Sequence, residues 1–239
     1  MFKRDKYLNQ LIQSRNNQQI KVITGLRRSG KSYLINNIFF DWLKEQGFDE
    51  NHIIKFAFDS ELDIRKLDEF LPNEPTIIKH IEGQKIINNR KFMLYIDKKT
   101  KSKGDYILLL DEIQNLDSFV RVLNGYLYLN KFDIFVTGSN SRFLSSQVDT
   151  EFSGRGYRIH ILPLSFSEYL SGVDLYERDA LNEYIHYGGI PLVELKKTDE
   201  EKVNEAVSIY KETYLKDIKD RHTHVNENNL DATLKVIAS

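Results

Sequence analysis

The chain has 239 residues, which is enough for one large α/β domain or for a core domain with a smaller appendage. Hydrophobic residues make up 41% and charged residues 29%, a composition that excludes a disordered chain or one built of membrane spans. Cysteine is absent, which excludes disulfides and thiolate metal sites, and 34 Lys and Arg against 35 Asp and Glu exclude a strong overall attraction for nucleic acid. With no targeting signal or membrane-length apolar run in the sequence, we expect a cytoplasmic protein without membrane contact.

Strands and helices alternate through the first two thirds of the chain. The predicted strands, which are short and apolar, cover residues 19–24, 52–58, 106–110, 134–137 and 157–162. The predicted helices cover residues 6–13, 31–46, 77–98 and 116–129. Such alternation implies parallel pairing through right-handed crossovers, so we expect an α/β fold with a parallel five-stranded sheet flanked by helices.

After Pro163 the pattern becomes helical only. Helices are predicted from Ser165, over 177–187, and after Thr198, where Ser165 and Thr198 each precede a glutamate at capping-box spacing. We expect a core with its N-terminal helix over 1–164, and a small all-helical lid with the start of a further region over 165–239. The sequence stops inside an apolar helical pattern, 234–238, which indicates a truncated C-terminal region.

A glycine-rich segment lies between the first predicted core strand and the helix that follows it. GLRRSGKS, residues 25–32, matches G-x-x-x-x-G-K-S, in which backbone amides curl around phosphates, Lys31 reaches the β- and γ-phosphates, and Ser32 ligates Mg²⁺. The residues expected to bind nucleotide are Gly25, Arg28, Ser29, Gly30, Lys31, Ser32 and Tyr33. For Arg28 three partners are open: a phosphate, a neighbouring subunit or only solvent.

Two acids end the strand over 106–110. Asp111 and Glu112 should lie at the carboxyl edge of the sheet, where ligands bind in open α/β folds. We expect Asp111 to support Mg²⁺ and the catalytic residue Glu112 to polarise an attacking water. The alternative is that this acidic pair only caps the next helix.

Polar residues also follow the next strand, in FVTGSNS. Thr137, Ser139 and Asn140 are candidates to hydrogen-bond the γ-phosphate or the water, and the alternative is a plain Gly-Ser turn. Arg155 lies in a glycine-flanked loop, where it would stabilise transition-state charge in a neighbour's site or be ordinary surface.

A literal N-K-x-D at 130–133 suggests guanine recognition. It precedes its strand, however, and should therefore lie at the wrong edge of the sheet, so we interpret it as a turn.

Several motifs in order resemble the AAA+-like (ASCE-division) P-loop ATPase family of bacteria and archaea. They are GLRRSGKSYLI, LLLDEIQN, VTGSNSRFL, SGRGYRIHILPLSFSEYL, YGGIP and LKDIKDRH, and they span nearly the whole chain. The resemblance implies phosphate-loop roles for residues 25–32, Walker B roles for Asp111 and Glu112, and a sensor role around Ser139. Members of the family typically continue into winged-helix and nuclease-like domains.

The function expected from these motifs is Mg²⁺-dependent ATP binding and hydrolysis, with ATP and Mg²⁺ as the ligands. Two rival hypotheses remain open: a slow nucleotide-dependent switch or scaffold, and a P-loop phosphotransferase. A homo-oligomer and a nucleic-acid or protein partner are both compatible with the sequence.

Overall fold

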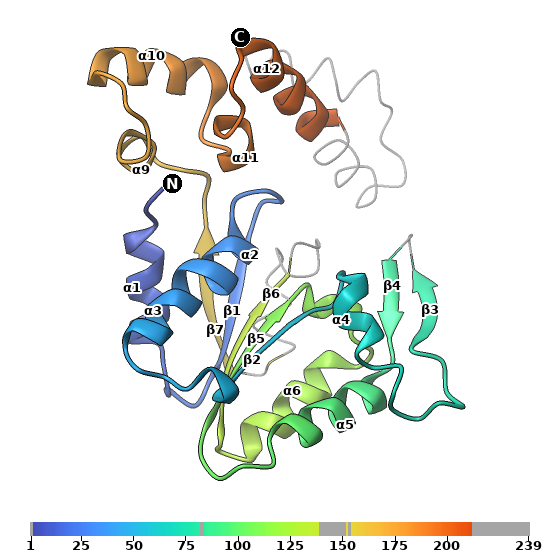
Figure 1. Ribbon diagram of the computed structural model, residues 1–239. Coiled ribbons are helices and arrows are strands. Elements are labelled where there is room, and N and C mark those ends of the chain that lie inside the picture. Colours follow the sequence, from blue (N-terminus) through green and yellow to red (C-terminus); the bar gives the residue numbers. More distant parts are fainter. Residues whose placement is uncertain (1, 82–83, 139–151, 153, 212–239) are drawn as a thin grey trace.

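The computed structural model describes residues 2–81, 84–138, 152 and 154–211 (Figure 1). Its strands are β1 (Ile20–Gly25), β2 (Ile53–Ala57), β3 (Ile77–Ile81), β4 (Gln84–Ile87), β5 (Tyr106–Asp111), β6 (Phe132–Thr137) and β7 (Gly156–Ile161). Its helices up to β7 are α1 (Asp5–Gln13), α2 (Lys31–Tyr33), the π-helical segment Leu34–Phe39, α3 (Phe40–Glu45), the 3₁₀ turn Glu50–His52, α4 (Glu61–Arg65), α5 (Asn89–Lys99), the 3₁₀ turn Ile113–Asn115 and α6 (Phe119–Tyr128). The C-terminal helices are α9 (Phe166–Leu170), α10 (Glu177–Tyr187), α11 (Pro191–Glu194) and α12 (Asp199–Ser208).

Five strands form one parallel sheet in the order β2-β5-β6-β1-β7, which confirms the predicted fold class. Strand β6 lies between β1 and β5, since Val136 pairs with Val22 on one side and with Leu110 on the other. In a parallel sheet the carboxyl ends of neighbouring strands share one edge. The segments that follow β1, β5 and β6 are therefore brought together although they are far apart in the sequence.

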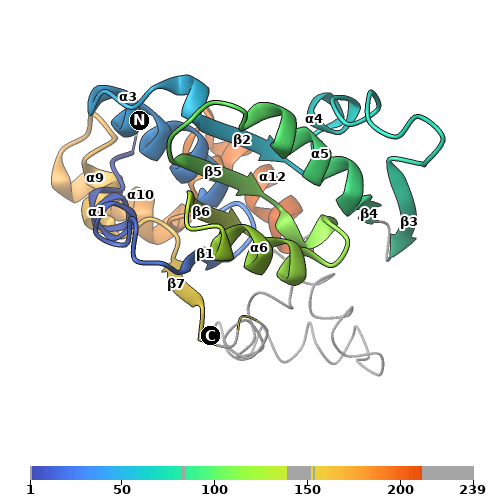
Figure 2. The same cartoon turned by 90° about the horizontal axis from the view of Figure 1, so that it is seen from below.

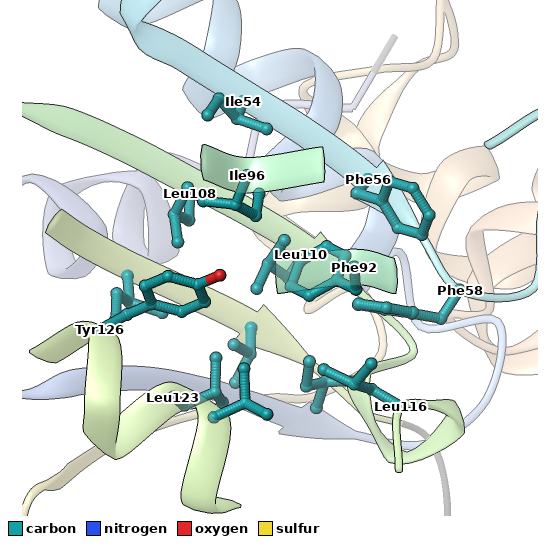
Figure 3. Packing of buried hydrophobic residues seen from close by; sticks show 14 of the residues in the cluster. Ile54, Phe56, Phe58, Phe92, Ile96, Leu108, Leu110, Leu116, Leu123 and Tyr126 are labelled. Carbon is teal, nitrogen blue, oxygen red and sulfur yellow. The ribbon is translucent and has the colours of Figure 1, made fainter. Parts of the chain in front are cut away.

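Each face of the sheet is covered by its own layer of helices (Figures 1 and 2). Alternate strand residues point to opposite faces, so Leu108 and Leu110 pack on the side of α5 and α6, whereas Ile107 and Leu109 pack on the side of α1 and the helix that follows the first strand. Figure 3 shows the first of these cores, where Phe92 of α5 lies among strand residues. Burial on both faces explains why the central strand is a continuous apolar run.

One predicted element is wrong. Residues 77–98, expected as a single irregular helix, form the antiparallel hairpin β3–β4 followed by α5, and the hairpin projects beyond the main sheet (Figure 1). Isoleucines at both ends of β3 and in β4 favour strands, and the side chain of Asn88 caps α5 by accepting from Arg90 N, which fixes the start of the helix. The short helices α4 and α11 were also not predicted from the sequence.

The C-terminal helices confirm the predicted caps. The Ser165–Glu168 and Thr198–Glu201 pairs both form capping boxes, and α10 spans the predicted 177–187. These helices share a small core around Tyr169 with Leu164 and Phe2. The predicted continuation of the last helix beyond residue 211 and the apolar pattern at 234–238 lie outside the described residues. In the part of the chain that the structure describes, no helix is long and apolar enough to cross a membrane.

Candidate active site

The glycine-rich loop connects β1 to α2 through strained backbone. Gly25 has φ 143°, and a Cβ there would lie 2.2 Å from the carbonyl oxygen of Ile161, so only glycine fits beside β7. Gly30 has φ 93° and immediately precedes the helix. Arg28, between them, also takes a positive φ, 63°. The loop therefore curls back over the start of the helix, as a phosphate-binding loop requires.

Lys31 lies beneath this loop and is 4% exposed. Its Nζ donates to the carbonyl oxygens of Gly25 at 3.0 Å and Leu26 at 2.8 Å. These two bonds hold the ammonium against the loop backbone. Binding of a phosphate by Lys31 stays a prediction.

Ser32 and Asp111 meet at the carboxyl edge of the sheet. Ser32 Oγ donates to Asp111 Oδ1 at 3.0 Å, Thr137 Oγ1 donates to the same oxygen, and Asn36 Nδ2 lies 3.5 Å from Oδ2. Burial raises the pKa of Asp111, against the opposing effect of the bonds from Thr137 and Ser32. The sequence anticipated the pairing of Ser32 with Asp111. It gave no sign of Asn36, which is one helical turn beyond Ser32.

Thr137 has a different role from the one expected at the γ-phosphate. It is fully buried, and its hydroxyl is engaged by Asp111 and by the backbone N–H of Glu112, which donates to it at 3.1 Å. Thr137 therefore fixes the two acids relative to each other. Ser139 and Asn140, the other sensor candidates, lie outside the described residues.

Glu112 directly follows the strand and adopts φ 53°, an unusual conformation for a non-glycine residue. Gln114 Nε2 donates to Glu112 Oε2. Asp59, two residues beyond β2, also faces this region; burial, and secondarily the charge of Glu112, raise the pKa of Asp59. Neither Gln114 nor Asp59 was singled out from the sequence, although both stand just after a strand at the ligand-binding edge.

One cleft of about 770 Å³ joins these groups. Lys31 and Glu112 both line it, so the predicted phosphate and water groups do share one edge of the sheet. Arg27, Arg28, Ser29, Gly30, Ser32 and Tyr33 line it from the loop and the start of the helix, and Asp59, Gln84, Gln114 and Asn115 line it from segments that follow other strands. Phe2, Arg4, Leu164, Pro191, Leu192 and Leu195 line it from the N-terminus and the C-terminal segment. The lining is therefore polar over the loop, and toward the C-terminal helices it is apolar apart from Arg4.

The residues of the loop fit a polyphosphate and a hard cation. The Ser29 hydroxyl is buried and has no hydrogen-bond partner among the described residues, which leaves a polar group of the loop unsatisfied. The hydroxyl of Ser32 beside the carboxylate of Asp111 is an oxygen donor set of the kind that Mg²⁺ prefers.

Arg28 is engaged by the C-terminal helices. Its Nη1 lies 2.6 Å from Glu205 Oε1, and Lys196 Nζ lies 3.1 Å from the other oxygen of the same carboxylate. The sequence left a phosphate, a neighbouring subunit or solvent as partners of Arg28, and the structure adds Glu205 of α12, so contact of Arg28 with a phosphate stays a prediction.

Arg155 lies at the opposite edge of the sheet. Its carbonyl oxygen accepts from Ile20 N, at the start of β1, while the phosphate loop follows the end of that strand. Six residues of strand separate these edges by roughly 20 Å. The side chain of Arg155 is exposed and remote from the cleft of its own chain. A role in a neighbour's site remains a prediction.

The N-K-x-D segment also lies at that far edge, as expected. Only its first part is a turn, since Phe132 and Asp133 already belong to β6. The carboxylate of Asp133 is buried and bonded to Lys21 Nζ, so it is engaged in the core at the opposite end of the sheet from the loop.

Comparison with known proteins agrees with this geometry. The model of a family described as AAA domain matches residues 17–170. An uncharacterized protein of Haemophilus influenzae is 34% identical over 81% of this chain and 44% of its own length. An uncharacterized protein of Methanocaldococcus jannaschii is 33% identical over 86% of this chain and 43% of its own length. The chain thus spans less than half the length of either relative. The structure of the S. cerevisiae Hsp104–ADP complex has a TM-score of 0.54 at 16% identity, over 92% of this chain and 33% of that one, and so shares the fold. The chain therefore belongs to the AAA domain family, among the AAA+-like P-loop ATPases.

Proposed function

We propose that this protein binds ATP with Mg²⁺ and hydrolyses it by attack of water on the γ-phosphate. The observation that carries the proposal is the cleft that Lys31, Ser32 and Glu112 all line, with Asp111 bonded to Ser32. A structure with the same fold is a complex with ADP, which supports a nucleotide as the ligand.

Each of these residues has a separate role in ATP binding or hydrolysis. The loop amides and Lys31 bind the phosphates, and Ser32 with Asp111 would hold Mg²⁺, which when bound neutralises charge on the β- and γ-phosphates. Glu112, which lines the same cleft as Lys31, orients the water and accepts its proton. Most of the acceleration would then come from positioning and electrostatics.

The apolar end of the cleft suits the base. Phe2, Leu164 and Pro191 lie on this side, together with Leu192 and Leu195, and Arg4 is the one charged lining residue among them. A purine ring buried there would replace water at an apolar surface, and ring contacts of this kind are the usual way in which pockets hold flat heterocycles. We propose adenine as the base.

Phosphate release from purified protein tests the reaction. Wild type is expected to release phosphate from ATP only with Mg²⁺. Lys31→Ala should lose ATP binding. Glu112→Gln should bind ATP but hydrolyse it roughly 10² to 10³ times more slowly than wild type. Lys44→Ala, at an exposed lysine further along the same helical stretch, is the matched control and should behave as wild type. Equal rates for wild type, Lys31→Ala and Glu112→Gln would exclude the proposal.

A nucleotide-dependent switch is the second candidate function. The ion pair between Arg28 and Glu205 favours it, because it links the phosphate loop to α12 and so gives the C-terminal helices a means to respond to nucleotide. If ATP binds with Lys31-dependent affinity while wild type and Glu112→Gln share the same negligible rate, the switch is the better description. Transfer of labelled phosphate to a small-molecule acceptor would support the phosphotransferase.

The remaining expectations form part of the proposal. We propose a boundary at 164/165, supported by the small cluster around Tyr169 in which Leu164 and Phe2 meet the C-terminal helices, and a cytoplasmic location. A homo-oligomer in which Arg155 reaches a neighbour's site, and coupling to a nucleic-acid or protein partner, are proposed from the family resemblance. Measurement of ATPase activity with and without DNA or RNA, and at increasing protein concentration, tests both.

A further inference from the structure

Gln114 contacts the Glu112 carboxylate in the cleft. It lies in the 3₁₀ turn Ile113–Asn115, directly after Glu112, and its Nε2 donates to Glu112 Oε2. An ionised carboxylate only accepts hydrogen bonds, so the amide nitrogen is the atom that must face it. The other atom of this amide, Oε1, is buried and has no hydrogen-bond partner among the described residues. A glutamine serving only the local structure would be expected to satisfy both ends of its amide.

The turn that carries Gln114 is held on both sides. Ile113 is fully buried, and Asn115 is buried with its Nδ2 at 3.5 Å from the carbonyl oxygen of Phe58, next to the end of β2. The backbone N–H of Asn115 donates to the Glu112 carbonyl at 3.0 Å. With both neighbours fixed in this way, the Gln114 side chain starts from a fixed backbone position, and its bond constrains the orientation of the Glu112 carboxylate.

The charge around Glu112 makes such a constraint necessary. Asp59 lines the same cleft and repels the carboxylate of Glu112, while Asp111 is adjacent in sequence. A carboxylate among like charges moves toward water unless a donor holds it. Gln114 is a neutral donor, so it can hold the carboxylate without cancelling the charge that activates water.

We propose that Gln114 is a positioning residue, which holds the Glu112 carboxylate in the orientation from which it activates the attacking water. The inference rests on the proposed function, because it gives Gln114 a part in the same reaction. Gln114 acts through Glu112 and has no need to touch the phosphate. Its loss should therefore reduce kcat and leave the binding of ATP unchanged.

The kinetic test uses variants of matched shape. Gln114→Met keeps the length of the side chain and removes the donor, and Gln114→Glu replaces the donor by a like charge. Both should lower kcat, by roughly 10- to 100-fold for Gln114→Met and by more for Gln114→Glu, with KM for ATP within about twofold of wild type. Gln46→Met, the same substitution at an exposed position after α3, is the control and should leave both constants unchanged.

A double-mutant comparison shows whether Gln114 acts through Glu112. In a Glu112→Gln background, Gln114→Met should cause almost no further loss, since the group that it positions is gone. A kcat for Gln114→Met equal to wild type, or the same fold loss with and without Glu112, overturns the inference.

A third measurement does not depend on turnover. A crystal structure of Gln114→Met should show the Glu112 carboxylate displaced from its wild-type position while Asp111 and Thr137 keep theirs, and an unmoved carboxylate overturns the inference. If wild type released no Lys31-dependent phosphate, the proposed function would fail, and the two crystal structures would still decide whether Gln114 orients Glu112.

Discussion

Ser32 Oγ lies 3.0 Å from Asp111 Oδ1, so a hydroxyl at the start of a helix and a carboxylate at the end of a strand, 79 residues apart in sequence, form one oxygen-lined site. The contact exists because β6 alone separates the strand before the phosphate loop from the strand that ends at Asp111. Thr137, at the end of β6, donates to the same carboxylate oxygen and completes the group. Three neighbouring strands thus each contribute to the proposed cation site at one edge of the sheet.

Ser32→Ala should raise the Mg²⁺ concentration needed for half-maximal ATP hydrolysis by roughly tenfold, because the site loses one oxygen and Asp111 loses one of the hydrogen bonds that orient it. Titration of Mg²⁺ at saturating ATP measures this shift. Ser167→Ala, at an exposed serine of α9, is the control. An unchanged Mg²⁺ requirement in Ser32→Ala would remove Ser32 from the proposed cation site.

Asp133→Asn should lower the free energy of unfolding by about 3 kcal/mol without changing the affinity for ATP or GTP. Its carboxylate pairs with Lys21, which is 1% exposed and whose pKa burial already lowers, so the substitution leaves a buried ammonium without its counter-ion. Urea denaturation and competition between ATP and GTP measure the two effects. Asp105→Asn, at an exposed acid near the same edge, is the matched control. A change in base preference with unchanged stability would instead support guanine recognition by this segment.

The sequence predicts those parts of the site whose residues are adjacent in the chain and whose chemistry is demanding. GLRRSGKS and the acids that end the central strand required only local patterns, and the parallel sheet followed from alternation. Residues 77–98 were predicted as one helix because their isoleucines and charged residues match helical spacing loosely. The structure of this segment is decided by cross-strand pairing in the hairpin β3–β4, which the periodicity of the sequence does not reveal.

Contacts between distant segments were not predictable from local patterns. Thr137 was expected at a phosphate because nothing in the sequence shows that its hydroxyl is buried against Asp111. Gln114 stands in a turn whose conformation depends on Asn115 reaching the end of another strand. Arg28 reaches α12 across 177 residues of chain. Each of these depends on tertiary packing, which the order of motifs does not encode locally.

Lys202→Met should destabilise the protein near neutral pH by roughly 2 to 4 kcal/mol, and the loss should shrink as the pH falls. Lys202 Nζ lies 2.7 Å from Glu183 and 3.5 Å from Glu194, whose side chain is 1% exposed. Burial raises the pKa of Glu194 above 4.5, while Lys202 opposes that rise. Without Lys202 the pKa of Glu194 rises further. The Glu194 carboxylate is then charged, buried and uncompensated only above this raised pKa. As the pH falls through that pKa toward 4.5, the carboxylate becomes neutral and the loss of stability shrinks.

Urea denaturation at about pH 7.5 and about pH 5 measures this dependence. The double variant Lys202→Met/Glu194→Gln should recover most of the lost stability near neutral pH, because it also removes the buried charge. Lys197→Met, at an exposed lysine just before α12, is the control. A loss that is equal at both pH values and persists in the double variant would show that Lys202 contributes through its packing against Tyr187 instead.

Glu205→Gln should tighten ATP binding by about 1.4- to fivefold at low ionic strength. Arg28 is about one third exposed, and a pair of this kind contributes on the order of 0.2 to 1 kcal/mol, which corresponds to that range of affinity. The substitution releases the guanidinium of Arg28 at the mouth of the phosphate loop, where the γ-phosphate becomes its strongest available partner. Titration with a fluorescent ATP analogue, repeated in roughly 0.5 M salt, measures the effect, which screening should largely remove.

The direction of this change separates two roles for the contact between the loop and α12. If Glu205 competes with the phosphate for Arg28, Glu205→Gln tightens binding, and Arg28→Ala, which removes the contested group, makes the Glu205 substitution silent. If the ion pair instead holds the C-terminal helices in the position that completes the cleft, Glu205→Gln weakens binding and Arg28→Ala weakens it similarly. Glu200→Gln, at an exposed acid in the first turn of the same helix, controls for the change in charge of α12 and should leave the affinity unchanged. Lys196 shares the Glu205 carboxylate with Arg28, so Lys196→Met should strengthen the ion pair between Glu205 and Arg28. Under either role, Lys196→Met should therefore shift the affinity for ATP in the direction opposite to Glu205→Gln.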